Sequence, residues 1–373
     1  MKIPHRITAL ALTLTTALAL SSCGSDPEPA AQSTGEAVTP LVFAIASAVI
    51  GPKEEVATFG VAKDQGFLAE EKLEVTTINT DGSVAALQAV ASGSADITAA
   101  DAGSILAARE KGLKIKAIGG LVQNWPWKIA VKPGSGIASG ADFKGKRIGV
   151  ISLASGSAPF ARGFVRQAGL DPEKDVELVP VGVGAQAAAA INGGEVDALA
   201  LYDQAYQVIA NSGTTFDYLP NPDMFQGIRS ITFAVREEAL TEQKDAITRY
   251  LRAAYKGMLF SAVNPEAAMS VGYKVFPAIL AGKDAKAQLP GDTTVLNAWI
   301  KTATPLTGAP ETFANWGAIS DAEWAKTQAY TLGAGQITKE VPLADVWDAS
   351  LLTGANDFDS AAVVTKAKAY TAG

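Results

Sequence analysis

One sequence pattern occurs twice in this chain, as AALQAVASGSAD at residues 85–96 and as QAAAAINGGEVD at residues 186–197. Each copy reads as a helix of small residues, a glycine that ends the helix, and a strand that opens with aspartate. Chance similarity between alanine-rich segments is the alternative interpretation. Two related units, each built from strands and helices, account better for the matching order and spacing.

The segments around each copy continue the alternation of strand-length apolar runs with helical spacing. This alternation is typical of parallel sheets with crossover helices, so we predict an α/β fold. In the first unit we expect strands at residues 41–47, 73–78, 95–100 and 115–120, with helices at 54–70, 84–91 and 104–111. In the second unit we expect strands at 128–131, 147–151, 176–181 and 196–201, with helices at 158–168 and 185–191. Beyond residue 239 we expect mainly helices, at 247–263, 265–275, 293–302 and 321–332.

The first forty residues read as an export signal followed by a tether. Lys2 and Arg6 flank the start of an apolar run at residues 7–20, which is shorter than the roughly 20 residues of a membrane-spanning helix. Residues 20–23 read Leu-Ser-Ser-Cys and resemble the lipobox of bacterial lipoproteins. We therefore expect a signal peptide at 1–22, lipidation of Cys23, and a flexible tether at 23–40. The protein would then be extracytoplasmic and lipid-anchored to the cell membrane; an ordinary secretory signal with an incidental cysteine is the alternative.

Composition excludes several classes of function. The chain has 31 basic and 38 acidic residues and a net charge of −7, so we expect no nucleic-acid partner. Its only histidine, His5, and its only cysteine, Cys23, both lie near the N-terminus. The remainder therefore lacks Ser-His-Asp and Cys-His catalysis and any His- or Cys-based metal site. We expect no metal, no cofactor and no enzymatic activity, with hydrolysis by the pair Asp101 and Asp203 as the formal alternative.

Several short stretches together carry a family resemblance. They are GVAKDQGFL at 60–68, LEV at 73–75, SGSADI at 92–97, DFKGKRIGV at 142–150, AGLDP at 168–172 and GGEVDA at 193–198. In this order and spacing they resemble the substrate-binding proteins of ABC importers, and are most similar to the nitrate/sulfonate/taurine and thiamine-precursor group.

The resemblance implies a periplasmic-binding-protein-like fold of type II, in which two α/β lobes are joined by two crossover strands. Lobe one would comprise residues 41–125 and 237–373, and lobe two residues 126–236. The resemblance also implies that a small-molecule ligand is captured between the lobes and delivered to an ABC permease with its cytoplasmic ATPase. Closure of the lobes would be a two-state equilibrium that the ligand biases. We expect the protein to be a monomer.

Candidate ligand-binding residues follow from the rule that ligands lie beyond the carboxyl ends of the strands. The rule selects Ser47, Asp81, Gly82, Ser83, Asp101 and Ser104 in lobe one, and Ser155, Gly156, Ser157, Tyr202 and Asp203 in lobe two. Ser155 to Ser157 combine close backbone access, hydroxyl donors and the start of a helix, which is typical of an anion site. Gly82 and Ser83 offer the same chemistry from lobe one. Ordinary N-capping by these serines is the alternative.

Three further residues lie near the expected crossovers. Trp125 and Trp127 are placed to stack on a planar ligand, or else to pack in the core of the hinge. Arg229 precedes the second crossover strand and is a candidate partner for a carboxylate or sulfonate, with a surface arginine as the alternative.

The expected cleft loops also contain carboxylates. Asp81, Asp101 and Asp203 would repel a simple inorganic anion unless they cap helices or pair with cations. We therefore expect a small organic anion, either a sulfonate or an aromatic carboxylate such as a phthalate-type acid. Taurine, a pyrimidine thiamine precursor and riboflavin remain alternatives. An alternative from another class is a ligand-sensing lipoprotein that binds a membrane protein.

Overall fold

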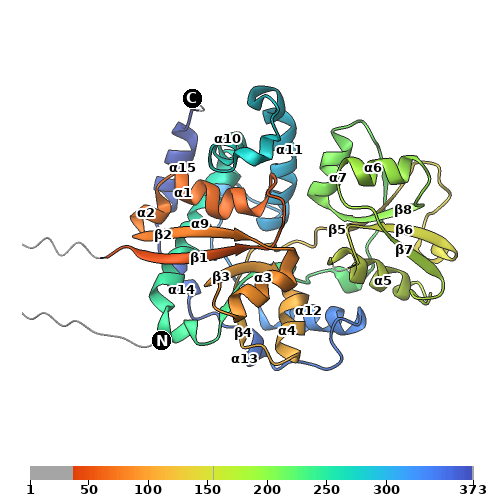
Figure 1. The fold of residues 1–373 in the computed structure, drawn as a ribbon, viewed down its shortest axis with the longest axis horizontal. Helices are drawn as coiled ribbons and strands as arrows, with labels where there is room; N and C mark the ends of the chain where they lie inside the picture. Colours follow the sequence, from red (N-terminus) through yellow and green to blue (C-terminus); the bar gives the residue numbers. More distant parts are fainter. Residues whose placement is uncertain (1–36, 154, 372–373) are drawn as a thin grey trace, which may run out of the picture. The chain divides into compact units, whose positions relative to one another are not determined.

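The structure, a computed structural model, describes residues 37–153 and 155–371. The predicted signal peptide, Cys23 and the predicted tether up to residue 36 lie outside these residues. The described chain contains two five-stranded sheets, and we call the parts of the chain built on them lobe one and lobe two (Figure 1). The first sheet has the order β2-β1-β3-β10-β4, with β1 (Thr39–Ile45), β2 (Leu73–Asn79), β3 (Ile97–Asp101), β4 (Ile115–Gly120) and β10 (Ile231–Arg236). The second has the order β7-β6-β8-β5-β9, with β5 (Trp127–Val131), β6 (Lys146–Val150), β7 (Val176–Pro180), β8 (Ala198–Tyr202) and β9 (Asp217–Leu219).

The helices are divided between the two lobes. Lobe one carries η1 (Val56–Val61), α1 (Ala62–Asp64), α2 (Phe67–Glu70), α3 (Gly82–Ala91), α4 (Ala102–Glu110), α8 (Ala239–Glu242), α9 (Lys244–Val263), α10 (Pro265–Val275), η4 (Pro277–Leu280), α11 (Ala285–Ala303), η5 (Pro310–Thr312), α12 (Asp321–Gly333), α13 (Leu343–Val346), α14 (Leu352–Ala355) and α15 (Ser360–Ala369). Lobe two carries η2 (Gly140–Phe143), α5 (Ser157–Gln167), α6 (Ala185–Asn192), α7 (Asp203–Ala210) and η3 (Asp223–Phe225).

Both sheets are mixed, so the parallel pairing predicted from the sequence applies to some of the strand pairs and not to others. β1 runs parallel to β2 and β3, and β6 runs parallel to β7 and β8. In contrast, β10 is antiparallel to β3 and β4, and β5 is antiparallel to β8 and β9. β5 and β10 are the strands that the chain enters after crossing from the other lobe, so they have no crossover helix that would force a parallel partner. β10 also belongs to the first sheet, although the sequence predicts residues 126–236 to lie in lobe two.

The aspartate that ends each copy of the repeat makes the same hydrogen bond in both lobes. In the first copy the carboxylate of Asp96 accepts a hydrogen bond from the backbone N–H of Val42 at 2.8 Å. In the second copy Asp197 does the same for the N–H of Arg147, also at 2.8 Å. Each aspartate thus ties the start of one strand to its parallel neighbour, β3 to β1 and β8 to β6. The prediction of two α/β lobes with the same local design is therefore confirmed.

Both faces of each sheet are covered by helices (Figure 1). In β1, Phe43 and Ile45 pack in one apolar cluster beneath η1, α9 and α10, whereas Ala44 packs in another beneath α3 and α4. In lobe two, α5 covers one face, while α6 and α7 cover the other. Burial on both faces explains why the strands read as continuous apolar runs rather than alternating ones.

Some element boundaries differ from the sequence prediction. β1 begins at Thr39, within the segment predicted to be tether. The predicted helix at 54–70 contains η1, which runs directly into α1, and it is interrupted before α2, because the backbone at Gly66 turns left-handed with φ +79°. α11 begins at Ala285 rather than near residue 293, since Asp284 caps its first turn and Pro290 is accommodated inside the helix. Within residues 37–153 and 155–371, none of the helices combines the length and apolar character that crossing a membrane requires.

Candidate functional site

Apart from Ser47, the candidate residues of lobe one lie at the starts of α3 and α4. The Asp101 carboxylate accepts a hydrogen bond from the N–H of Ser104 at 3.1 Å and so caps the helix. The N–H of Asp101 donates in turn to the hydroxyl of Ser83 at 3.0 Å, which joins α3 to α4. Gly82 begins α3 with φ +80°, a conformation that favours glycine. Asp81 occupies the N-cap position of α3 without a capping bond from its side chain.

Asp101 has an unusual protonation equilibrium. Burial raises the pKa of its carboxyl to about 6, although hydrogen bonds from the N–H groups of Ser104 and Gly103 act in the opposite direction. The carboxyl therefore changes its charge near pH 6.

In lobe two, the loop from Ser155 to Ser157 is held together by its own hydroxyl groups. Ser157 is completely buried, and its hydroxyl accepts a hydrogen bond from the N–H of Ile151 at 2.9 Å. The hydroxyls of Ser155 and Ser157 lie 2.6 Å apart. A Cβ atom at Gly156 would lie 3.1 Å from the indole of Trp127, so glycine allows the loop to pack on that ring. The hydrogen bonds of these hydroxyls stabilise the conformation of the loop and of the start of α5.

The predicted aromatic residues pack mainly against protein. Trp127 contacts Tyr202 edge-to-face, with ring centroids 5.4 Å apart. Trp125 stacks on Phe225 at 5.8 Å and meets Tyr330 of α12 edge-on at 5.0 Å. Trp125 therefore joins the core of lobe two to a helix of lobe one.

Two predicted charged residues are engaged in ion pairs. Asp203 lies 2.5 Å from the ammonium of Lys128; burial raises the pKa of Asp203, and Lys128 opposes this shift. Arg229 is 8% exposed and pairs with Glu323 of α12, while it donates to the carbonyl of Gln123 at 3.2 Å. The structure thus places Arg229 at the crossover segments between the lobes.

The loop after β1 contains a charged cluster that the sequence analysis does not select. The ammonium of Lys53 lies 3.0 Å from Glu54 and 2.9 Å from Glu55, whose side chain is 1% exposed. Burial acts to lower the pKa of Lys53, but the charges of Glu54 and Glu55 outweigh it and raise this pKa above its ordinary value. Burial raises the pKa of Tyr202, and the positive charge of Lys53 opposes that shift across the cleft. Nearby, the Ser47 hydroxyl donates to the carbonyl of Val49 at 2.6 Å.

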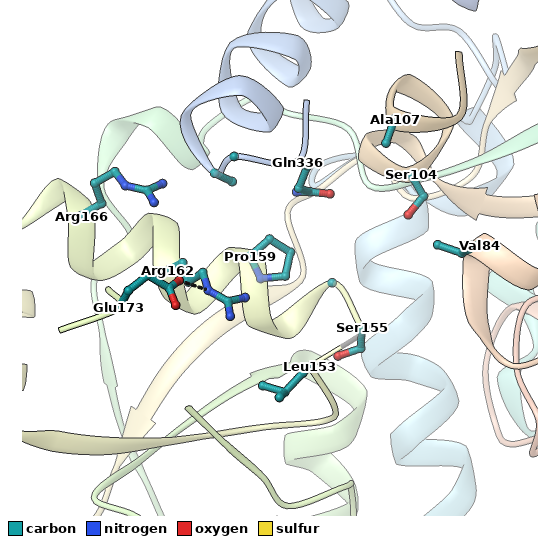
Figure 2. A pocket seen from close by; sticks show the side chains of 13 residues that line it. Val84, Ser104, Ala107, Leu153, Ser155, Pro159, Arg162, Arg166, Glu173 and Gln336 are labelled. Carbon is teal, nitrogen blue, oxygen red and sulfur yellow. Dashed lines mark hydrogen bonds and ion pairs between the residues drawn. The ribbon is translucent and has the colours of Figure 1, made fainter. Parts of the chain in front are cut away.

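A cavity of 480 Å³ lies between the two lobes, within the size range of small-molecule sites (Figure 2). Its walls come from α3 and α4, from the loop after β6 together with α5, and from the turn after α12. The lining residues are Val84, Ser104, Ala107, Leu153, Ser155, Gly156, Pro159, Arg162, Arg166, Glu173, Ala334, Gly335 and Gln336.

The cavity includes only part of the predicted site. Among the candidates from the sequence, Ser104, Ser155 and Gly156 line it. The apolar contributors Val84 and Leu153 have no sequence signal beyond their position near the carboxyl ends of strands. Gln336 lies more than 200 residues from the cavity walls on α3 and α4, and no local pattern marks it.

An ion pair lies at the cavity, and hydrogen bonds connect the lobes nearby and elsewhere. Arg162 pairs with Glu173 at 2.7 Å. Arg166 of α5 donates to the carbonyl of Gly333 at the end of α12, which connects the lobes on one side. Asn211, just after α7, donates to the carbonyl of Gly291 in α11 at 3.0 Å and connects the two lobes at a second place.

Among the residues that the structure describes, no group of three or more His, Cys, Asp or Glu side chains is arranged to hold a metal ion.

Residues 53–268 match the family described as NMT1/THI5 like, over more than half of the chain. The chain belongs to this family. The riboflavin-binding protein RibY of Chloroflexus aurantiacus is 25% identical over 332 residues, which cover 88% of this chain and 89% of RibY. The formylaminopyrimidine-binding protein of Halalkalibacterium halodurans is 25% identical over 214 residues, covering 57% of this chain and 64% of that protein.

Solved structures share the fold at low identity. The alkanesulfonate-binding protein SsuA from Xanthomonas axonopodis pv. citri, bound to MOPS, has a TM-score of 0.62 at 18% identity, covering 84% of this chain and 99% of that chain. The desulfurization enzyme DszB has a TM-score of 0.54 at 16% identity, covering 85% and 98%. The fold is thus that of periplasmic binding proteins of type II, as predicted. Family and fold together make the chain an ABC-type substrate-binding protein for a small molecule, although the fold alone is also used by an enzyme.

Proposed function

We propose that this protein is the extracytoplasmic binding subunit of an ABC importer and captures a planar heterocycle of the flavin or pyrimidine class. The observation that carries the proposal is the pair Val84 and Leu153, which line the same cavity from opposite lobes. Their side chains are 57% and 55% exposed. Large apolar side chains held in contact with water on both walls of a cavity favour an apolar, flat ligand between them.

The electrostatics of the site support the same ligand class over a simple anion. Of the two arginines that line the cavity, Arg162 pairs with the carboxylate of Glu173, and Arg166 donates to the carbonyl of Gly333. A sulfonate or carboxylate that bound to Arg162 would have to displace Glu173 or share the cation, and one that bound to Arg166 would compete with the Gly333 carbonyl. The hydroxyls of the Ser155 loop are likewise used within the protein. These contacts favour the heterocycle over the organic anion expected from the sequence.

The family relatives agree with this choice. Both curated relatives are named for nitrogen heterocycles, a flavin and a pyrimidine. The likeness to the sulfonate-binding SsuA is a likeness of fold, at 18% identity.

Titrations of the purified mature protein test the ligand class. We expect riboflavin or formylaminopyrimidine to bind and to raise the melting temperature, and to be recovered chemically unchanged from the complex. Leu153→Ser removes one apolar wall and should weaken binding about tenfold, a loss of about 1.4 kcal/mol. Leu306→Ser is the matched control, because Leu306 is 80% exposed outside the cavity lining. Tight binding of MOPS or taurine with no response to flavins or pyrimidines would refute the assignment.

We further propose that Cys23 carries the lipid anchor and that the following residues tether a monomeric binding domain near its permease and ATPase. The proposal is supported by the lipobox-like residues 20–23 and by the Gly-, Ser- and Pro-containing composition of the segment that follows. In cells, Cys23→Ala should release the protein from the membrane fraction. Mass spectrometry of the wild-type N-terminal peptide should show acyl chains, and an unmodified cysteine would contradict the anchor.

A further inference from the structure

Gln336 presents a side-chain amide to the cavity. The side chain is partly buried, lines the cavity and points toward Ser104 (Figure 2). Within residues 37–153 and 155–371 the amide makes no hydrogen bond or other polar contact. By comparison, the Ser155 hydroxyl donates to the carbonyl of Ser152, and the Arg162 guanidinium donates to Glu173.

The backbone holds this amide in a fixed place. α12 ends at a turn in which Gly335 has φ +74°, and the N–H of Gln336 closes the turn by donating to the carbonyl of Thr331 at 3.0 Å. The next residue, Ile337, is 2% exposed in the core beneath α3 and α4. The backbone of Gln336 is therefore held on one side by the hydrogen bond to Thr331 and on the other by the buried side chain of Ile337.

α12 is in turn fixed to the segments that connect the lobes. Glu323 near its start pairs with Arg229, and Tyr330 near its end contacts the ring of Trp125. The turn that carries Gln336 is thus positioned by the crossovers themselves. A side chain placed in this way can contact a ligand that is held by either lobe.

A glycine makes room for the amide. A Cβ atom at Gly103 would lie 2.8 Å from Oε1 of Gln336 and 3.0 Å from Oδ1 of Asp101. The absence of that atom allows both side chains to approach the first turn of α4 at Gly103. The amide thereby adds a polar group to a cavity whose other walls include Val84, Leu153 and Pro159.

We infer that the side-chain amide of Gln336 forms hydrogen bonds with the polar edge of the bound heterocycle. It thereby selects rings in which an N–H donor lies next to a carbonyl acceptor. This inference rests on the ligand class proposed above. A primary amide presents one donor face and one acceptor face in one plane, in either of its two orientations. A ring amide or imide is its complement: its N–H donates to Oε1 while its carbonyl accepts from Nε2, as glutamine exchanges one donated and one accepted hydrogen bond with adenine. A sulfonate offers acceptors alone and would leave Oε1 without a partner, at about 1–3 kcal/mol.

A double-mutant cycle tests this role with riboflavin and 3-methylriboflavin, which lacks the imide N–H; uracil and 3-methyluracil form a second pair. The wild-type protein should bind the unmethylated ligand about tenfold more tightly. Gln336→Ala should weaken binding of that ligand and reduce the preference to less than about threefold. Gln88→Ala, the same change on an exposed part of α3, should leave affinity and preference unchanged.

The outcomes separate this inference from the proposed function. If Gln336→Ala keeps the wild-type preference, or the wild type shows none, the role of Gln336 is wrong while the ligand class stands. If neither flavins nor pyrimidines bind to the wild type, both are wrong. Equal melting temperatures of the wild-type and variant proteins without ligand establish that a loss of binding is not a loss of folding.

Discussion

Replacement of Asp101 by asparagine should change how the stability of the protein depends on pH. In the folded protein the pKa of this carboxyl is raised from 3.8 to about 6 by burial. The folded state therefore holds the proton more tightly than the unfolded state. Stability that is present below about pH 4 is lost as the pH rises toward 6, and no further loss occurs above that value. Asparagine keeps an oxygen that can accept from the N–H of Ser104, so the cap on α4 is retained.

The expected change in the free energy of unfolding follows from the pKa shift of Asp101. About two pKa units correspond to about 3 kcal/mol, and the partial exposure of Asp101 reduces the expected value to about 1–3 kcal/mol. Urea unfolding of the wild type and Asp101→Asn, followed by tryptophan fluorescence between pH 4 and 8, measures it. The free energy of unfolding of the variant should rise relative to the wild type between about pH 4 and 6. Comparing the two proteins at each pH cancels contributions from all other groups.

Asp142 provides a control with the opposite sign. Hydrogen bonds from the N–H of Ala138 and from Ser139 lower the pKa of Asp142, so its ionised form stabilises the folded state. Asp142→Asn should therefore destabilise the protein at neutral pH, and the difference from wild type should shrink only below about pH 4. Parallel stability curves for Asp101→Asn and wild type across pH 4–8 would refute the assigned burial of the Asp101 carboxyl.

Three further substitutions test the packing that positions the site, each by urea unfolding at neutral pH. Gly149→Ala would bring a Cβ atom within 2.7 Å of Leu199 and should lower the free energy of unfolding by about 1–3 kcal/mol; an unchanged value would mean that β6 shifts freely. Ser320→Ala removes the capping box of α12 and should lower it by about 1 kcal/mol, and no loss would contradict the cap. Asp197→Ala leaves a strand N–H without its acceptor and should lower it by about 1–3 kcal/mol, whereas a neutral result would contradict the role of the repeat aspartates.

Features fixed by neighbouring residues could be predicted from the sequence. α10 occupies residues 265–275 as predicted, because Asn264 caps it and Pro265 occupies its first turn. The two repeat copies predicted matching helices, glycine turns and strands, and the structure adds that Asp96 and Asp197 bond to the parallel neighbouring strand. The placement of Ser104, Ser155 and Gly156 at the cavity followed from the rule on strand ends.

The sequence by itself determined the α/β class, the two related lobes and the loops from which a site could be built, since helical and strand periodicity, caps and glycine turns act over a few residues. Only the tertiary structure decided that β10 joins the first sheet, that Arg229 is paired with Glu323, and that Gln336 shares a cavity with Leu153. These are contacts between residues about a hundred or more positions apart. They depend on how whole lobes pack, and burial and pairing at such distances leave no local pattern in the chain.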